Sequence, residues 1–146
     1  MKRAIQHTAT AAVLALGAEL SRRGYDVTFT MGNTPKIDMM CSVPNRPAFK
    51  IQVKGVSNRA AFYVQEEFFS GDAQSDSYLV VVYVPKLETK DSFEFHILRH
   101  DQAKLEFEKM PKFKKDGRPY IGGSGLNWKS VSQYKDWNAF PPVPTE

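Results

Sequence analysis

The segment YLVVVYVP, residues 78–85, constrains the fold more than any other part of the chain. Its residues are apolar at odd and even positions alike, so a strand formed here is apolar on both faces. Such a strand is typical of the buried centre of a sheet. Pro85 ends it, because proline has no main-chain N–H to donate to a neighbouring strand. The sequence therefore predicts a sheet that is covered on both sides.

A helix is expected over residues 5–23, before the first strand. Gly24, after two arginines, is typical of the end of such a helix. The basic start and the Ala/Leu run also resemble a signal peptide, but polar residues interrupt the run and it is too short to span a bilayer. The helix is the favoured interpretation because the apolar residues share one helical face: Val13, Leu14, Leu16, Ala18 and Leu20.

The remaining elements follow from alternation and from turn residues. Residues 25–31, 36–43 and 48–55 are expected to form an antiparallel meander packed on the first helix, with turns at 32–35 and 45–47. Further expected elements are a strand running into a short helical turn (58–69), a strand near an edge (93–98), helices at 99–110 and 126–137, and a proline-rich tail at about 138–146. This order predicts one domain over residues 1–146, of the α/β class, with a central mixed β-sheet flanked by helices.

Composition bears on the class of the protein, its partners and its location. The chain has 146 residues, of which 42% are hydrophobic and 25% charged, values typical of a globular domain. A net charge of +4 permits a polyanionic partner. Cys41 is the single cysteine, so no intrachain disulfide forms, and a cytoplasmic location is expected. No small-molecule cofactor is expected, because the glycine-rich segment 121–128 matches neither the dinucleotide fingerprint nor the P-loop.

The third strand of the meander has one apolar and one polar face. In FKIQVKGVS, residues 49–57, alternation places Lys50, Gln52 and Lys54 on the same side. Asp38 lies between Ile37 and Met39 in the preceding strand, where an ionised carboxylate is costly without a partner or a metal. A tight hairpin would bring Asp38 beside Gln52. The polar face is either a solvated surface or the wall of a site.

These residues carry a resemblance that covers about residues 8–56. GAELSRRGYDVTF, then Asp38, then IQVKG resembles the PD-(D/E)xK nuclease superfamily, which has the restriction-endonuclease-like fold, and most closely its Holliday-junction-resolvase-like and Mrr-like branches in their QxK variant. The resemblance implies an endonuclease that hydrolyses DNA phosphodiester bonds with Mg²⁺ or Mn²⁺. It implies that Glu19, Asp38, Gln52 and Lys54 are catalytic, and that Glu19, Asp38, Gln52 and Val53 hold the metal.

Gln52 stands where the family most often has an acid. Its side-chain oxygen is able to ligate a metal but brings no charge, so metal affinity should fall. A catalytically inactive nuclease-fold protein that binds nucleic acid or a protein partner is therefore the alternative. A third hypothesis is a small adaptor subunit whose C-terminal segment DWNAFPPVP docks on a copy of itself or on a partner.

The expected partner is DNA, with a homodimer as one allowed form and no membrane association. Nucleic-acid contacts are expected from residues bordering the site and from a basic loop, which is equally well interpreted as an ordinary solvated loop. His96 is expected to be a hydrogen-bonded structural histidine, Cys41 a small strand residue, and Phe68, Phe69, Trp128 and Trp137 core or interface residues. The expected nucleic-acid contacts are Lys36, Lys50, Arg59, Lys112, Lys114 and Lys115.

Overall fold

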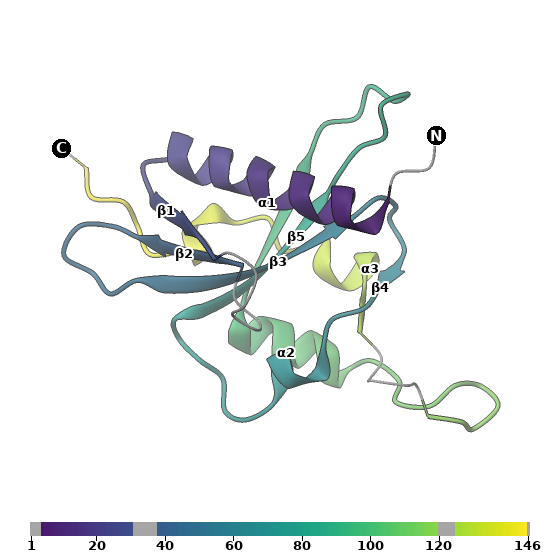
Figure 1. Cartoon of the computed structure of the whole chain (residues 1–146). Coiled ribbons are helices and arrows are strands. Elements are labelled where there is room, and N and C mark those ends of the chain that lie inside the picture. Colours follow the sequence, from purple (N-terminus) through teal and green to yellow (C-terminus); the bar gives the residue numbers. More distant parts are fainter. Residues whose placement is uncertain (1–3, 31–37, 120–124, 146) are drawn as a thin grey trace.

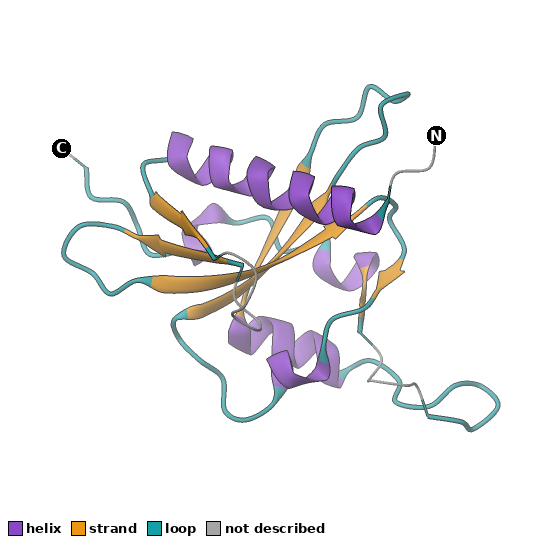
Figure 2. Ribbon diagram, viewed as in Figure 1, coloured by secondary structure: helices purple, strands orange, loops and turns teal. Residues whose placement is uncertain are grey.

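The protein, described here from a computed structural model, is a mixed sheet with helices on both faces (Figures 1 and 2). The structure describes residues 4–30, 38–119 and 125–145. Its elements are α1 (Ile5–Arg22), β1 (Asp26–Phe29), β2 (Met39–Ser42), β3 (Phe49–Val56), β4 (Ala61–Phe62), the 3-10 helix η1 (Glu66–Phe69), β5 (Ser77–Tyr83), β6 (Glu94–Arg99), α2 (His100–Glu108), β7 (Leu126–Asn127), α3 (Trp128–Val131) and the 3-10 helix η2 (Trp137–Ala139).

The five-stranded sheet has the order β1-β2-β3-β5-β6. Strands β1, β2 and β3 form the expected antiparallel meander, β5 runs parallel to β3, and β6 is antiparallel to β5. The connection from β3 to β5 contains β4 and η1, and β4 pairs with β7 in a separate two-stranded sheet. The predicted α/β class with a mixed central sheet is confirmed.

Strand β5 lies between β3 and β6, and each of its seven residues is buried. The central position predicted from its two apolar faces is therefore confirmed. Its alternate side chains enter two separate apolar clusters. Val80 packs in the cluster on the α1 side of the sheet, and Leu79 and Val81 pack in the cluster on the α2 side. Figure 1 shows α1 and α2 on opposite sides of the sheet.

Helix α1 approaches strand β3 very closely at Gly55. A Cβ atom added there would lie 2.8 Å from the Thr8 carbonyl oxygen and 2.9 Å from the Ala12 Cβ. An isolated glycine inside a strand often marks such a close approach. Gly55 therefore lets the first half of α1 lie on the strand directly beside Lys54.

The expected helix over 126–137 is wrong for most of that range, because α3 covers only Trp128–Val131. Asn127 caps this helix by accepting a hydrogen bond from the Ser130 N–H at 2.8 Å. Beyond the helix the chain lies against β6, where the Tyr134 carbonyl accepts a bond from the Ile97 N–H at 3.1 Å. Pairing with the sheet thus replaces further helical turns.

The C-terminal tail packs on the chain's own core. Phe140 is 1% exposed and stacks on Phe49, with ring centroids 5.4 Å apart. The Tyr25 hydroxyl donates a hydrogen bond of 2.6 Å to the Pro141 carbonyl. Phe140, in the segment that was expected to dock on a partner, is therefore buried within this chain, and the less buried residues of the segment remain for the adaptor hypothesis.

Within the ranges that the structure describes, no helix is both long enough and apolar enough to cross a membrane.

Candidate active site

Asp38 is attached to β3 through both its main chain and its side chain. It directly precedes β2 instead of lying in the middle of that strand as expected, and residues 36 and 37 lie outside the described ranges. Its N–H donates to the Ile51 carbonyl at 3.0 Å. Its Oδ2 accepts a bond of 2.8 Å from the Val53 N–H. A carboxylate therefore takes the place of a strand partner at this edge of β3.

The main-chain carbonyl of Val53 points toward the same edge. In an antiparallel pair, the N–H and C=O of one residue face the same neighbouring strand. Because the Val53 N–H faces Asp38, the Val53 C=O does so too. The site thus combines a carboxylate oxygen with a main-chain oxygen.

Gln52 and Lys54 lie on the face of the sheet that α2 covers. Alternation along β3 places them with Val56, which belongs to the α2-side cluster, while Ile51 and Val53 face α1. Both side chains are partly buried. The Gln52 Oε1 is buried without a hydrogen-bond partner among the described residues. An unpaired buried acceptor costs free energy, so this oxygen is a candidate to bind a donor or a cation.

Burial acts on both charged groups of the site. It raises the pKa of Asp38, against the smaller opposing effects of the Val53 N–H bond and of the Lys54 charge. It lowers the pKa of Lys54, against the opposing effect of the Asp38 charge. Each group thus stabilises the charged form of the other, but not enough to offset desolvation. A pair of groups perturbed in this way is typical of functional sites.

The structure brings together Asp38, Gln52, Val53 and Lys54, but it places Glu19 elsewhere. Glu19 lies on α1, which packs on the opposite face of the sheet. Its carboxylate accepts hydrogen bonds from Arg22 at 2.7 and 3.0 Å and from Arg23 at 2.9 Å. The hydrogen bond from Arg22 is the main cause that lowers the pKa of Glu19. Its described contacts are therefore those of an ion-paired residue at the end of a helix.

The basic residues expected around the site differ in their surroundings. The Lys50 Nζ lies 3.8 Å from an Asp76 oxygen, a loose and solvent-accessible ion pair. Arg59 donates a bond of 2.6 Å to Glu94 and stacks 4.1 Å from the Tyr83 ring centroid, so its charge is already used locally. Lys36 lies outside the described residues. The other three candidates, Lys112, Lys114 and Lys115, lie on an exposed loop after α2.

His96 is structural as expected, but its expected hydrogen bond is absent. The side chain is 2% exposed, and neither ring nitrogen has a hydrogen-bond partner among the described residues. Its Nε2 lies 3.6 Å from a Glu94 oxygen, and its ring meets Trp128 edge to face. Burial lowers the pKa of His96, with the Glu94 charge opposing that shift.

Cys41, Phe68 and Phe69 are core residues, as expected. Cys41 is 1% exposed, and burial raises the pKa of its thiol to about 12, so it does not form a thiolate at neutral pH. Phe68 and Phe69 are buried in the α2-side cluster. None of the three is available as a nucleophile or as a platform for stacking bases.

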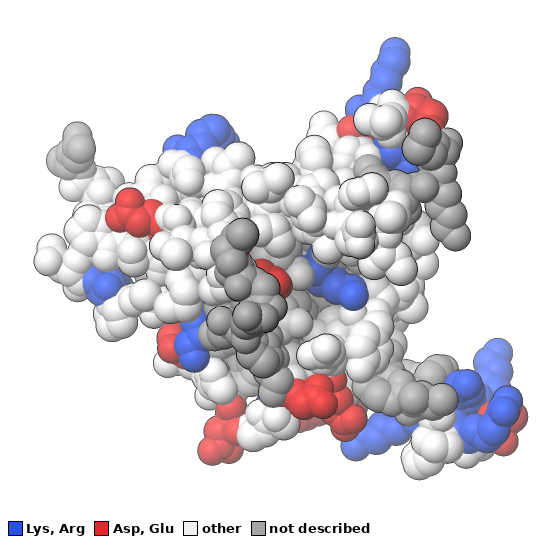
Figure 3. Space-filling model, viewed as in Figure 1, with Lys and Arg blue, Asp and Glu red and all other residues white. Residues whose placement is uncertain are grey.

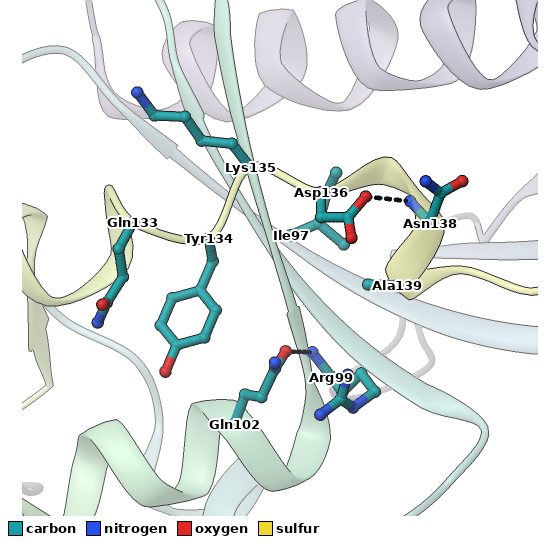
Figure 4. A pocket seen from close by; sticks show the side chains of 9 residues that line it. All are labelled: Ile97, Arg99, Gln102, Gln133, Tyr134, Lys135, Asp136, Asn138 and Ala139. Atoms are coloured by element: carbon teal, nitrogen blue, oxygen red, sulfur yellow. Dashed lines mark hydrogen bonds between the residues drawn. The ribbon is translucent and has the colours of Figure 1, made fainter.

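A pocket of about 480 Å³ lies away from Asp38, between β6, the start of α2 and residues 133–139 (Figure 4). Two of its polar side chains make hydrogen bonds to the main chain at helix starts. Gln102 accepts a bond from the Arg99 N–H, and Asp136 accepts one from the Asn138 N–H. These hydrogen bonds cap α2 and η2, so they have a structural role.

The Asp38 cluster offers oxygen donors and, within the described ranges, lacks a group of acidic, histidine or cysteine side chains. Among the residues that the structure describes, no three His, Cys, Asp or Glu side chains come together. The donors at the cluster are instead one carboxylate, the amide oxygen of Gln52 and the carbonyl of Val53. All three are oxygen atoms, the donor type that Mg²⁺ and Mn²⁺ prefer.

Sequence reasoning missed the contribution of Gly55, although a glycine directly after Lys54 in a strand pattern was a readable signal. It also missed the buried state of the Gln52 oxygen, for which no local signal exists.

No protein-family model, no curated protein and no solved structure matches the chain. The support for a function is therefore the geometry around Asp38 and the resemblance carried by residues 8–56.

Proposed function

We propose that this protein is a metal-dependent endonuclease that hydrolyses DNA phosphodiester bonds at the Asp38–Gln52–Lys54 site, on a domain of the restriction-endonuclease-like fold. The supporting observation is the bond of 2.8 Å from the Val53 N–H to Asp38, which holds the carboxylate against β3 next to Gln52, whose buried oxygen has no hydrogen-bond partner among the described residues. The fold is supported by the order of a helix, an antiparallel meander and a parallel strand.

The donor set fits a hard divalent cation. Asp38, Gln52 and the Val53 carbonyl would hold Mg²⁺ or Mn²⁺ through oxygen atoms. When bound, the ion supplies Lewis-acid stabilisation of charge on the phosphoryl oxygens and lowers the pKa of a water. Since Asp38 is the only carboxylate of the cluster among the described residues, substrate phosphate is expected to supply part of the binding.

Lys54 has the electrostatic role in this proposal. It is a compact charge on a partly buried strand face, so its field at the site is less screened by water than that of an exposed lysine. It would orient the attacking water or stabilise negative charge on the phosphate as the bond to the leaving oxygen breaks. The Asp38 carboxylate favours the charged form of Lys54, which opposes the lowering of the Lys54 pKa by burial.

The test is cleavage of plasmid DNA with Mg²⁺ or Mn²⁺. Asp38→Asn and Lys54→Ala should each reduce the rate by about 100-fold or more, the scale seen when one preorganised electrostatic group is removed. Lys90→Ala is the control, since Lys90 is an exposed lysine to which no role at the site is assigned, and it should retain most of the rate. If the Asp38 and Lys54 variants cut as fast as the wild type, the proposed mechanism is wrong.

The second candidate function is a catalytically inactive nuclease-fold protein. Two observations favour it: Glu19 is bonded to two arginines, and position 52 is neutral, which leaves Asp38 as the one acid among the described residues of the site. Calorimetric titration with Mn²⁺ separates the two functions. Heat of binding in the wild type favours the enzyme, whereas no heat in the wild type together with binding by Gln52→Glu favours the inactive relative.

A further inference from the structure

The net charge of the protein is concentrated in one exposed loop. Residues 109–118 contain five lysines or arginines and one aspartate, a balance of +4 that equals the net charge of the whole chain. The rest of the molecule is therefore neutral as a whole. Figure 3 shows basic side chains gathered where this loop leaves the body of the protein. A surface that attracts a polyanion is expected here before anywhere else.

The loop has a defined shape. The Lys114 N–H donates to the Arg118 carbonyl at 2.7 Å, and the Gly117 N–H donates to the Lys114 carbonyl at 2.9 Å. Gly117 has a positive φ of 86°, which the turn requires, and Asp116 accepts bonds from the Arg118 main chain and side chain. A bridge between Phe113 and Pro119 closes the base of the turn. Less conformational entropy is lost on binding when a loop is ordered in advance.

Phe113 is the unusual residue of the loop. It is 62% exposed, stands between Lys112 and Lys114, and takes part in no ring-to-ring contact within the described part of the chain. The other phenylalanines near this end of the molecule, Phe69 and Phe107, stack on each other. An aromatic ring between two lysines suits a ligand with a flat apolar surface and nearby negative charge.

We propose that residues 109–119 form a DNA-binding hairpin on which an unpaired base stacks against Phe113, so that the preferred substrate is DNA with a gap or a single-stranded segment. The inference rests on the proposed nuclease function. In an intact duplex the faces of the bases are covered by their neighbours, and only unpaired bases offer them to a side chain. The hairpin follows α2, which packs on the sheet face that carries Gln52 and Lys54.

The charges and the ring have separate roles. Lys112 and Lys115 form no ion pair with any described residue, so each is available to a phosphate, whereas Lys109 and Arg118 already pair with Glu106 and Asp116. Phosphate contacts give affinity for any DNA and make binding sensitive to salt. Base stacking adds affinity only where bases are exposed. The preference for gapped DNA should therefore depend on Phe113 and the overall affinity on the lysines.

The test is fluorescence anisotropy of the full chain, with chelator present, on a labelled duplex and on the same duplex with a short gap. The wild type should bind the gapped DNA about 10-fold more tightly, and Phe113→Leu should abolish the difference, as expected for one stacked base. Phe113→Trp should preserve it. Phe93→Leu is the matched control, because Phe93 is an exposed aromatic residue outside the loop. Lys112→Gln and Lys115→Gln should weaken binding to both DNAs and each reduce the salt slope by about one.

The outcomes distinguish the two proposals. If the protein cuts DNA through Asp38 and Lys54 but binds gapped and intact duplex equally, only the hairpin inference is overturned. The hairpin inference is also overturned if Phe113→Leu binds gapped DNA with the same preference as the wild type. If the wild type binds neither DNA but binds vesicles of anionic phospholipid, the loop is a membrane-binding surface and the hairpin inference fails, while the nuclease proposal is decided by the cleavage assay. Circular dichroism of Phe113→Leu verifies that the variant is folded.

Discussion

Strands β3 and β5 are parallel neighbours in register, yet they present opposite chemistry to the same face of the sheet. Gln52 pairs with Leu79 and Lys54 pairs with Val81. Leu79 and Val81 are fully buried, whereas Gln52 and Lys54 are partly buried at the edge of the same apolar cluster. The polar pair therefore lies where water is partly excluded, a costly arrangement that proteins usually keep for a function.

The largest effect is expected from making β5 resemble β3. Val81→Lys would bury a charge on a fully buried strand, which should lower the free energy of unfolding by about 3–5 kcal/mol. The reverse change, Lys54→Val, should be neutral or stabilising, because it removes a partly desolvated charge. Urea denaturation measures both. Equal destabilisation by the two variants would show that Lys54 is as important to the core as Val81.

A medium effect is expected on the α1 side of β3. Gly55→Ala should destabilise the protein by about 1–3 kcal/mol, because the new Cβ would lie 2.8 Å from the Thr8 carbonyl oxygen and α1 must move away. Thermal unfolding measures the loss. Adding Ala12→Gly to Gly55→Ala removes one of the two clashes, so the double variant should lose less than the sum of the single changes. Simple additivity would contradict this close approach.

The smallest effect concerns the charge of Asp38. Burial raises its pKa in the folded state, so the folded protein holds this proton more tightly than the unfolded chain does. The stability that Asp38 contributes is thus present at pH values below its ordinary pKa and is lost as the pH rises through the raised value. Asp38→Asn should keep the Val53 bond and raise the free energy of unfolding at pH 7 by about 0.5–2 kcal/mol.

The test is to measure the free energy of unfolding of Asp38→Asn and of the wild type across pH 3–8. The difference should grow with pH and disappear at the acid end. A variant that is less stable than the wild type at pH 7 would show that the ionised carboxylate stabilises the fold. The same variant should lose DNA cleavage, so that Asp38 would be needed for activity although it lowers the free energy of unfolding at pH 7.

Much of the fold could be predicted because its signals are local. The alternation in Phe49–Val56 and the apolar faces of residues 78–85 specify strands wherever the rest of the chain lies. Helix α3 was mispredicted because Trp128, Val131 and Tyr134 have helical spacing, while the Tyr134 carbonyl bonds instead to Ile97 on β6. A hydrogen bond to a distant strand leaves no trace in a local pattern.

Some features of the candidate site were likewise predictable from local sequence signals, and others depend on tertiary packing. The sequence pattern predicted that Asp38, Gln52 and Lys54 lie together, and the register of β2 and β3 places them close to one another. Glu19 fits the same pattern in the sequence, but its position on α1 and its two arginine partners depend on the packing of the helix. The sequence could not reveal that the Gln52 oxygen is buried, since that depends on which segments cover β3.

The sequence by itself determined the type and order of the main elements, the central position of β5, and the polar face of β3, because these follow from periodicities of two and of about 3.6 residues. The tertiary structure alone decided that a carboxylate meets the Val53 N–H, that Glu19 pairs with arginines, and that the tail buries Phe140. These contacts join residues far apart in the chain or on different elements, and they exist only once sheet order and register are set.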